Sequence, residues 1–97
     1  MSYTVYAMFD KEHPRKDRYT GMTSMSVAKR FQRRLAAAKS GRRPEPVNEW
    51  INEIGPHRVG VRVVAECATK VDAMTSEQKH IAAKTHISKG GLNKRMK

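Results

Sequence analysis

The sequence predicts an α+β fold, with a small three-stranded antiparallel sheet flanked by three helices in the order β-β-α-α-β-α. Two β-rich runs lie close together near the N-terminus and are separated by a short charged loop. Two stretches with apolar residues at helical spacing follow, and a run of alternating valines precedes a third helical stretch. The 97 residues are expected to form a single domain, residues 1–97, with one modest core.

The first two strands are expected as a hairpin over residues 3–9 and 18–22. Both runs are rich in residues that favour strands, and the polar segment between them contains Pro14. Pairing of the two runs would bring Tyr6 and Tyr19 near each other on one face of the sheet. Ordinary strand aromatics are the simpler interpretation of these tyrosines, because aromatic residues favour strands generally.

The helix expected over residues 25–39 carries concentrated positive charge. Its apolar stripe consists of Val27, Phe31 and Leu35. Its polar side carries Lys29, Arg30, Arg33 and Arg34. Arg30 and Arg34 project together because they are one turn apart. Arg30 also borders the apolar stripe, so it should lie closer to the body of the protein than Lys29 or Arg33. Gly41 is placed to end the helix.

A second helix is expected from Pro46 to about residue 54, followed by a strand over residues 58–67. The helix has one apolar face made of Val47, Trp50, Ile51 and Ile54. Trp50 should lie in the core because it shares this face, and a base-stacking role is the alternative. In the strand, one face is expected to hold Val59, Val61, Val63 and Ala65. The strand must join the hairpin, since a two-stranded ribbon is marginally stable alone.

A third helix is expected from about residue 70 to 88, starting at a Thr69 cap. Its inward stripe is expected to hold Ala73, Met74, Ile81, Ala82 and Thr85. Glu77 falls within this stripe, although burying a carboxylate is costly unless it is paired. An ion pair with an arginine or a role as a divalent-metal ligand would explain this position, and the residues alone leave both open.

Charge favours a polyanionic partner, and nucleic acid is the usual one. The net charge is +11, and the stretch from Lys11 to Arg43 holds eleven Lys and Arg residues against two acidic ones. A merely solvated basic face is the plain alternative. No apolar run is long enough for a membrane span, and the single Cys67 excludes an internal disulfide, so a cytoplasmic setting is expected.

The remaining polar candidates are the histidines and the C-terminal segment. The histidines are His13, His57, His80 and His86, and all four are expected at the surface. Gly90 and Gly91 are expected to stop the third helix before a short return segment that carries Asn93. A frayed basic tail is an equally good interpretation of this segment.

Five short segments occur in an informative order. They are Thr4-Val5-Tyr6, Tyr19-Thr20-Gly21, Lys29-Arg30-Phe31, Ser76-Glu77-Gln78-Lys79-His80-Ile81 and Gly91-Leu92-Asn93. Their order and rough spacing resemble the GIY-YIG nuclease family over nearly the whole chain. This resemblance implies a three-stranded sheet flanked by helices and a nuclease site with a single Mg²⁺ or Mn²⁺ ion.

The resemblance also implies roles for the matching residues. Tyr6 would act as the general base or position the attacking water, and Tyr19 would be its partner at the scissile phosphate. Gly21 would let the backbone turn closely into the helix. Arg30 would hold the phosphate, and Asn93 would brace the site by hydrogen bonds.

Two further positions decide how closely the chemistry follows the family. Glu77 would be the sole protein ligand of the cation, with water and phosphate oxygens completing the shell. Arg34 stands where many family members have a histidine or tyrosine, and an arginine cannot accept a proton. Cations such as Arg34, rather than a histidine, are therefore expected to make a hairpin tyrosine basic enough.

The expected function is divalent-metal-dependent cleavage of DNA, most simply duplex DNA, with low or loop-determined specificity in a phage, mobile-element or repair setting. RNA stays open as a substrate, as does self-association or a specificity partner. The nucleic-acid surface is expected to include Arg15, Lys16, Lys29, Arg33, Arg42 and Arg43. The alternatives are a catalytically impaired DNA- or RNA-binding module on the same fold and an RNA-binding protein supported by charge alone.

Overall fold

The computed structural model describes residues 2–41 and 45–93. The strands and α-helices are β1 (Tyr3–Asp10), β2 (Asp17–Thr23), α1 (Val27–Ser40), α2 (Pro46–Ile54), β3 (Val59–Cys67) and α3 (Lys70–His80). Three short helical turns are η1 (Pro56–Arg58), η2 (Ile81–Thr85) and η3 (Ile87–Lys89). The predicted order β-β-α-α-β-α is confirmed. Arg42 and Arg43, which were expected at a DNA surface, lie outside the described residues.

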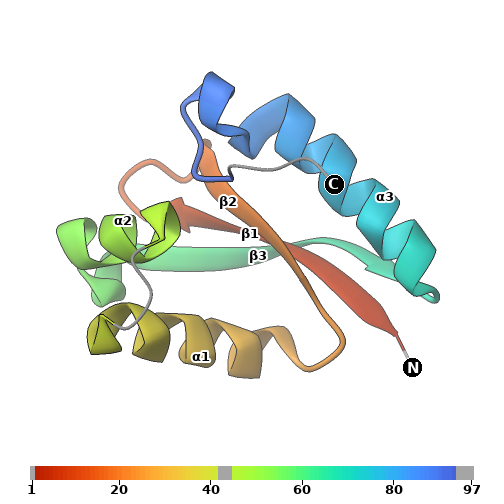
Figure 1. Ribbon diagram of the computed structural model, residues 1–97, viewed down its shortest axis with the longest axis horizontal. Helices are drawn as coiled ribbons and strands as arrows, with labels where there is room; N and C mark the ends of the chain where they lie inside the picture. The colour runs from red at the N-terminus through yellow and green to blue at the C-terminus, as the bar shows by residue number, and fades with distance from the viewer. Residues whose placement is uncertain (1, 42–44, 94–97) are drawn as a thin grey trace.

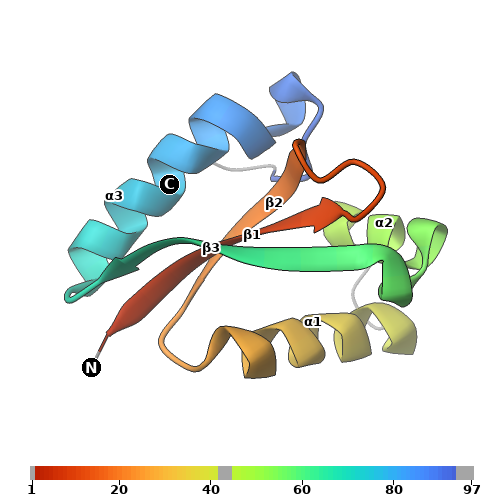
Figure 2. The ribbon, with the colours of Figure 1, turned by 180° about the vertical axis from the view of Figure 1, so that it is seen from behind.

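The three strands form one antiparallel sheet in the order β2-β1-β3, so β1 is central. In both views α1 and α2 lie on one side of the sheet and α3 lies on the other (Figures 1 and 2). The sheet therefore has two faces with separate helical covers, and each face can be assigned from the side chains that it buries.

The face under α1 and α2 holds the larger part of the apolar core. Its buried members are Tyr6, Met8, Ala38, Val47, Trp50, Ile51 and Val59. Trp50 is 5% exposed, which confirms its predicted place in the core. Tyr6 is 1% exposed, so its whole ring is removed from solvent. Burial of one such aromatic side chain contributes about 1.5–3 kcal/mol.

The face under α3 is defined by smaller and partly polar side chains. Ala73 and Ile81 are buried one turn on either side of Glu77, which is itself half-buried. The predicted inward position of Glu77 is therefore confirmed. Thr20 lies opposite Ala7 in the hairpin, and its hydroxyl contacts that of Thr85 at 2.7 Å. Because Thr20 follows Tyr19 in an ordinary stretch of β2, the α3 face is opposite the tyrosine face.

Regular pairing of the hairpin is interrupted by a β-bulge at Arg18. Met8 pairs with Tyr19 and Phe9 pairs with Asp17, which leaves Arg18 as the extra residue. A bulge changes which face the following side chains occupy. Arg18 and Tyr19 consequently do not point to opposite faces, as neighbours in a regular strand do.

A second β-bulge, in β3, interrupts the regular alternation that was predicted for this strand. Val5 pairs with Ala65 and Tyr6 pairs with Val63, so Val64 is the extra residue. Tyr6 and Val5 point to opposite faces, and their partners therefore do so as well. Ala65 was expected on the same face as Val63, and that prediction is wrong because of this bulge.

The third helix ends earlier than predicted. α3 stops at His80 and continues into the π-helical turn η2, where the amide of His86 donates to the carbonyl of Ile81 at 2.7 Å. A π-turn adds residues to the helical turn and so rotates the side chains that follow. Ala82 was expected on the inward stripe, but it is exposed.

The other helix ends are formed by the capping residues that the sequence predicts. Ser26 caps α1 by accepting from the amide of Lys29 at 3.2 Å, and Thr69 caps α3 by accepting from the amide of Asp72 at 3.1 Å. Gly41 ends α1 in the left-handed conformation, with φ of 67°. Within residues 2–41 and 45–93, every helix is too short or too polar to cross a membrane.

Candidate active site

The two hairpin tyrosines share one face of the sheet, as predicted. Tyr6 lies opposite Gly21, and Tyr19 lies opposite Met8, two residues along β1 from Tyr6. The phenol ring of Tyr6 lies over Gly21, where an added Cβ would be 2.5 Å from Cζ of the ring. Gly21 was expected to allow a turn into the helix, but it lies within β2. The structure gives it a different purpose, which is to leave room for the Tyr6 ring.

Several polar atoms on this side of the sheet are buried and have no hydrogen-bond partner among the described residues. They include the hydroxyl oxygen of Tyr6 and Nε of Arg30. A buried tyrosine hydroxyl usually finds a partner, and leaving one unsatisfied costs about 1–3 kcal/mol. These atoms indicate a place where a water molecule or a ligand group completes the structure.

Arg34 is held beside Tyr19 by hydrogen bonds and a ring contact. One terminal nitrogen donates to the Tyr19 hydroxyl at 3.1 Å, and the other donates to Oε2 of Glu45 at 3.1 Å. The guanidinium carbon also lies 5.2 Å from the centroid of the Tyr19 ring, within cation–π range. The Arg34 side chain is only 12% exposed, whereas that of Glu45 is 44% exposed.

Tyr19 is kept in its protonated form. Burial raises the pKa of the Tyr19 phenol above 10.0, and this effect outweighs the neighbouring Arg34, which lowers the pKa. Tyr6 and Glu45 act in the same direction as burial. The Tyr19 phenol is suited to donate a hydrogen bond. The expectation that Arg34 and other cations make Tyr6 basic enough concerns the other phenol and stays a prediction.

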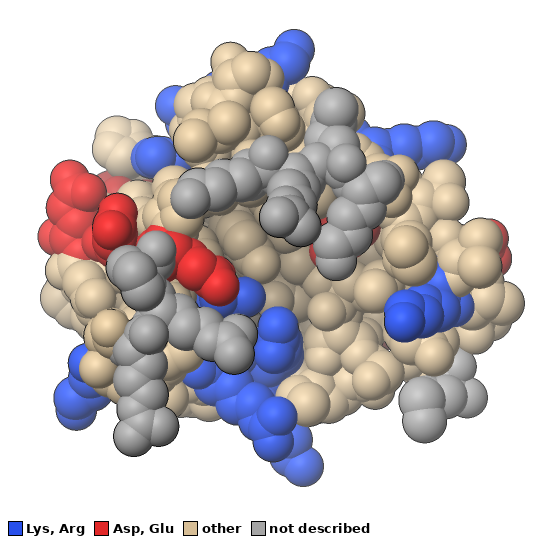
Figure 3. All heavy atoms as spheres, viewed as in Figure 1, with Lys and Arg blue, Asp and Glu red and all other residues tan. Residues whose placement is uncertain are grey.

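A cavity of about 470 Å³ opens beside Tyr19 and Arg34. It is lined by Tyr19, Arg30, Arg33, Arg34, Ala37, Glu45 and Asn48. Arg30 and Arg34 are half-buried, whereas Lys29 and Arg33 are exposed, as the helical pattern predicted. Lys and Arg atoms gather over α1 and acidic atoms gather over α2 (Figure 3). Three arginines around one cavity are well suited to a phosphate group, since the planar guanidinium matches its oxygens.

Asn93 braces the strand that carries Tyr19. Its side-chain amide donates to the carbonyl of Thr20 at 3.0 Å and accepts from the amide of Thr20 at 2.8 Å. The amide of Leu92 donates to the carbonyl of Arg18 at 2.7 Å. The return segment therefore pairs with β2 along the edge that β1 leaves free, on both sides of Tyr19.

Glu77 is separated from this group by the sheet. It lies on α3, whereas the cavity lies under α1 and α2, and the described lining does not include it. In residues 2–41 and 45–93, no three Asp, Glu, His or Cys side chains gather closely enough to hold a metal ion together. The structure thus brings together Tyr6, Tyr19, Arg30 and Arg34, and it places Glu77 on the opposite face.

A buried ionic cluster on the α3 face was missed by the sequence reasoning. The carboxylate of Asp17 accepts from Arg62 through two nitrogens and lies 2.8 Å from Nε2 of His80. Burial alone would raise the pKa of Asp17, but the hydrogen bonds from Arg62 and His80 hold it below 3.8. His80 was expected at the surface, and its side chain is 14% exposed because Asp17 holds it.

Comparison with protein-family models, with curated proteins and with solved structures gave no match. A functional assignment for this α+β protein therefore rests on the residues of the site and on the order of the sequence motifs.

Proposed function

We propose that the protein is a metal-dependent endonuclease of the GIY-YIG type that hydrolyses DNA phosphodiester bonds. One observation carries the proposal. The buried hydroxyl of Tyr6 and Nε of Arg30 have no partner among the described residues, on the side of the sheet where Tyr19 and three arginines line a cavity. A phosphate and its attacking water would satisfy such atoms.

In this proposal the arginines bind the substrate and the tyrosines handle the water. Arg30 and Arg34 hold the non-bridging oxygens of the scissile phosphate, where negative charge develops during attack. Tyr6 positions the water by hydrogen bonding, and its phenolate form, left after the phenol proton has gone to solvent, takes up the proton of the water. Tyr19 donates a hydrogen bond to a phosphate oxygen, in keeping with the raised pKa of its phenol. Attack forms one phosphorus–oxygen bond and breaks another, and the departing 3′ oxygen takes up a proton from solvent.

Glu77 is the residue proposed to hold Mg²⁺ or Mn²⁺, which would stabilise the charge on the leaving oxygen. A half-buried carboxylate fits a hard cation that completes its shell with water and phosphate oxygens. Because Glu77 lies across the sheet from the cavity, substrate would have to contact both faces of the sheet. That requirement makes Glu77 the most informative residue to change.

A second candidate function is nucleic-acid binding without cleavage. Two observations favour it: Arg34 replaces a group that could accept a proton, and Glu77 lies across the sheet from the cavity. The same basic surface would serve such a protein, so binding alone does not separate the two functions.

Cleavage of supercoiled plasmid separates them. We expect nicking with Mg²⁺ or Mn²⁺, none with EDTA, and a loss of at least about 100-fold in Tyr6→Phe and Glu77→Gln. Tyr3→Phe and Glu53→Gln are matched controls, because Tyr3 lies at the start of β1 and Glu53 is exposed on α2. Both controls should nick at the wild-type rate.

Two results would contradict the proposal. If wild-type protein retards DNA in a gel but nicks no plasmid with either metal, the chain is a binding module. If Glu77→Gln retains wild-type nicking while Tyr6→Phe loses it, the role assigned to Glu77 is wrong and the metal, if required, is held elsewhere.

A further inference from the structure

The hairpin loop between β1 and β2 surrounds a second cavity, with a volume of about 590 Å³. It is lined by Asp10, Glu12, His13, Pro14, Arg15, Lys16 and Arg18. None of these residues lines the cavity beside Tyr19. The second cavity is thus a separate feature of the described structure, and the proposed cleavage chemistry makes no use of it.

The acidic residues of this cavity are already engaged. Nε of Arg58 donates to Oδ1 of Asp10 at 3.2 Å and lies 3.0 Å from Oε2 of Glu12. The hydrogen bonds from Arg58 hold the pKa of Asp10 below 3.8. Because Arg58 offsets part of this negative charge, the cations of the lining remain able to attract an anion.

Arg18 reaches the cavity because of the bulge in β2. The extra residue directs its side chain toward α2, where the guanidinium carbon lies 5.7 Å from the centroid of the Trp50 ring. Tyr19 packs against the same core cluster that contains Trp50. Two consecutive residues, Arg18 and Tyr19, therefore face the same side and link the two cavities.

The side chain of Arg18 is also incompletely satisfied. Its Nε is buried and has no hydrogen-bond partner among the described residues. Stacking on Trp50 fixes the guanidinium in one place, so less freedom is lost when an anion binds to it. A buried cationic donor without a partner is a second, independent indication of a ligand at this cavity.

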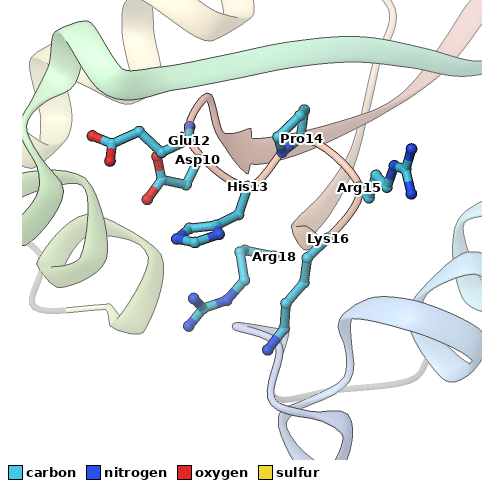
Figure 4. A pocket seen from close by; sticks show the side chains of 7 residues that line it. All are labelled: Asp10, Glu12, His13, Pro14, Arg15, Lys16 and Arg18. Carbon is cyan, nitrogen blue, oxygen red and sulfur yellow. Dashed lines mark hydrogen bonds between the residues drawn. The ribbon is translucent and has the colours of Figure 1, made fainter.

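His13 and Lys16 complete the arrangement. The side chains of His13, Lys16 and Arg18 extend toward the same side of the loop, whereas Arg15 points away from them (Figure 4). Nζ of Lys16 reaches over the turn at Gly90, 3.6 Å from the place where a Cβ would stand. The loop and the start of β2 thus present three nitrogen-bearing side chains on one side of the cavity, and Arg15, which also lines it, points away from them.

We propose that His13, Lys16 and Arg18 form a second phosphate-binding site, which holds a backbone phosphate of the strand that lies across Tyr19. The proposal rests on the proposed function, since it takes the ligand to be nucleic acid. One strand carries a charge about every 3.4 Å along the helix axis, so a strand bound at Tyr19 brings further phosphates toward its neighbour Arg18. This second contact fixes where along the strand the cleavage site lies.

Fluorescence anisotropy with a labelled DNA duplex in EDTA tests the site without cleavage. Lys16→Gln and Arg18→Gln should each weaken binding about 5- to 10-fold at moderate salt. Each should also reduce the slope of log K against log salt by about 0.9, the value for one lost phosphate contact. Lys11→Gln removes the same charge from the same loop at an exposed residue outside the cavity lining, and it should change affinity less than about 2-fold.

Folding is checked by the circular dichroism and melting temperature of each variant. Arg18→Lys keeps the charge and should restore most of the affinity lost in Arg18→Gln, even if contact with Trp50 weakens. If Arg18→Lys binds as poorly as Arg18→Gln while Lys16→Gln binds normally, the effect is one of packing and the site is refuted.

Arg30→Gln separates this proposal from the proposed function. Weak binding by Arg30→Gln together with normal binding by Lys16→Gln and Arg18→Gln would refute the second site and leave the function standing. Normal binding by all three variants would refute the second site and the phosphate contact assigned to Arg30, while the nicking assay decides the proposed function separately. A titration with inorganic phosphate and a mononucleotide gives the last comparison. If either binds the wild type as tightly as the duplex does, the site takes a free anion and the strand assignment fails.

Discussion

At the scale of single residues, the cavity beside Tyr19 contains one group of the wrong sign for a phosphate site. Glu45 accepts from Arg34 at 3.1 Å and contributes to the raised pKa of Tyr19. Its carboxylate holds Nη1 of Arg34, a residue that the proposed function assigns to phosphate. In that proposal, nucleic acid would have to replace Glu45 at Arg34.

This arrangement predicts a gain of binding on removal of a single charge. Glu45→Gln should tighten DNA binding about 3- to 10-fold and steepen the salt dependence by about one phosphate contact. The amide leaves Arg34 its hydrogen bond to Tyr19 but no longer repels the polyanion. Glu53→Gln, on the exposed side of α2, is the matched control for net charge. Equal affinities for Glu45→Gln and Glu53→Gln would show that Glu45 does not compete with the substrate.

At the scale of elements, β2 is held from three directions. β1 pairs with it along one edge, and Asn93 pairs with the backbone of Thr20 along the other. The Tyr6 ring occupies the space that a side chain at Gly21 would fill. The position of Tyr19 therefore depends on a glycine and an asparagine that touch no substrate in the proposed reaction.

Gly21→Ala tests the contact between the strands. The added methyl would lie 2.5 Å from Cζ of Tyr6, so the buried ring must move. Such overpacking should lower the free energy of unfolding by about 1–3 kcal/mol, measured by urea denaturation. The double variant Gly21→Ala/Tyr6→Leu should lose less stability than the sum of the losses of the two single variants, because the smaller leucine relieves the clash. A Gly21→Ala protein within about 0.5 kcal/mol of wild type would exclude the close contact.

The same elements show how far the sequence could predict the structure. Element type and order followed from periodicity, and the inward place of Glu77 followed from its spacing to Met74 and Ile81. The bulges at Arg18 and Val64 did not follow, because a one-residue shift in pairing leaves no mark on the composition of a strand. Each bulge changed the face of residues around it.

In the candidate site, contacts within one local hairpin could be predicted, whereas contacts between packed elements could not. The proximity of Tyr6 and Tyr19 could be predicted because both lie in one local hairpin. The Arg34–Glu45 pair joins α1 to the start of α2, and the Asp17–His80 pair joins β2 to α3. Such contacts depend on how the elements pack in three dimensions, which periodicity alone does not determine. For that reason His80 was expected at the surface.

At the scale of the whole molecule, the cluster around Asp17 joins the three parts of the α3 face. Asp17 begins β2, Arg62 lies in β3 and His80 ends α3. Asp17 is 4% exposed, whereas the Arg62 side chain is 46% exposed, so the cluster is buried on one side only. It connects the two edge strands to the helix that covers them. Its loss should therefore affect global stability more than local order.

The lowered pKa of Asp17 gives this cluster a pH signature. A carboxyl group whose pKa is lower in the folded state adds stability that is present above its unfolded pKa, near 3.8, and is lost as the pH falls through the folded value. Wild-type stability, measured as the free energy of unfolding in urea, should therefore decline below about pH 4. Asp10, whose pKa is also lowered, contributes in the same direction.

Asp17→Asn separates the buried cluster from this background. The variant should lose about 2 kcal/mol at pH 7, since it removes charged hydrogen bonds to Arg62 and His80. Its difference from wild type should shrink toward pH 3, because wild-type Asp17 is then becoming protonated as well. Asp10 is still present in the variant and still titrates. The free energy of unfolding of Asp17→Asn should therefore change less with pH than that of wild type, but it should not become independent of pH. Glu53→Gln should follow the wild-type curve throughout. A constant difference between Asp17→Asn and wild type from pH 7 to pH 3 would mean that Asp17 acts through packing and not through its charge.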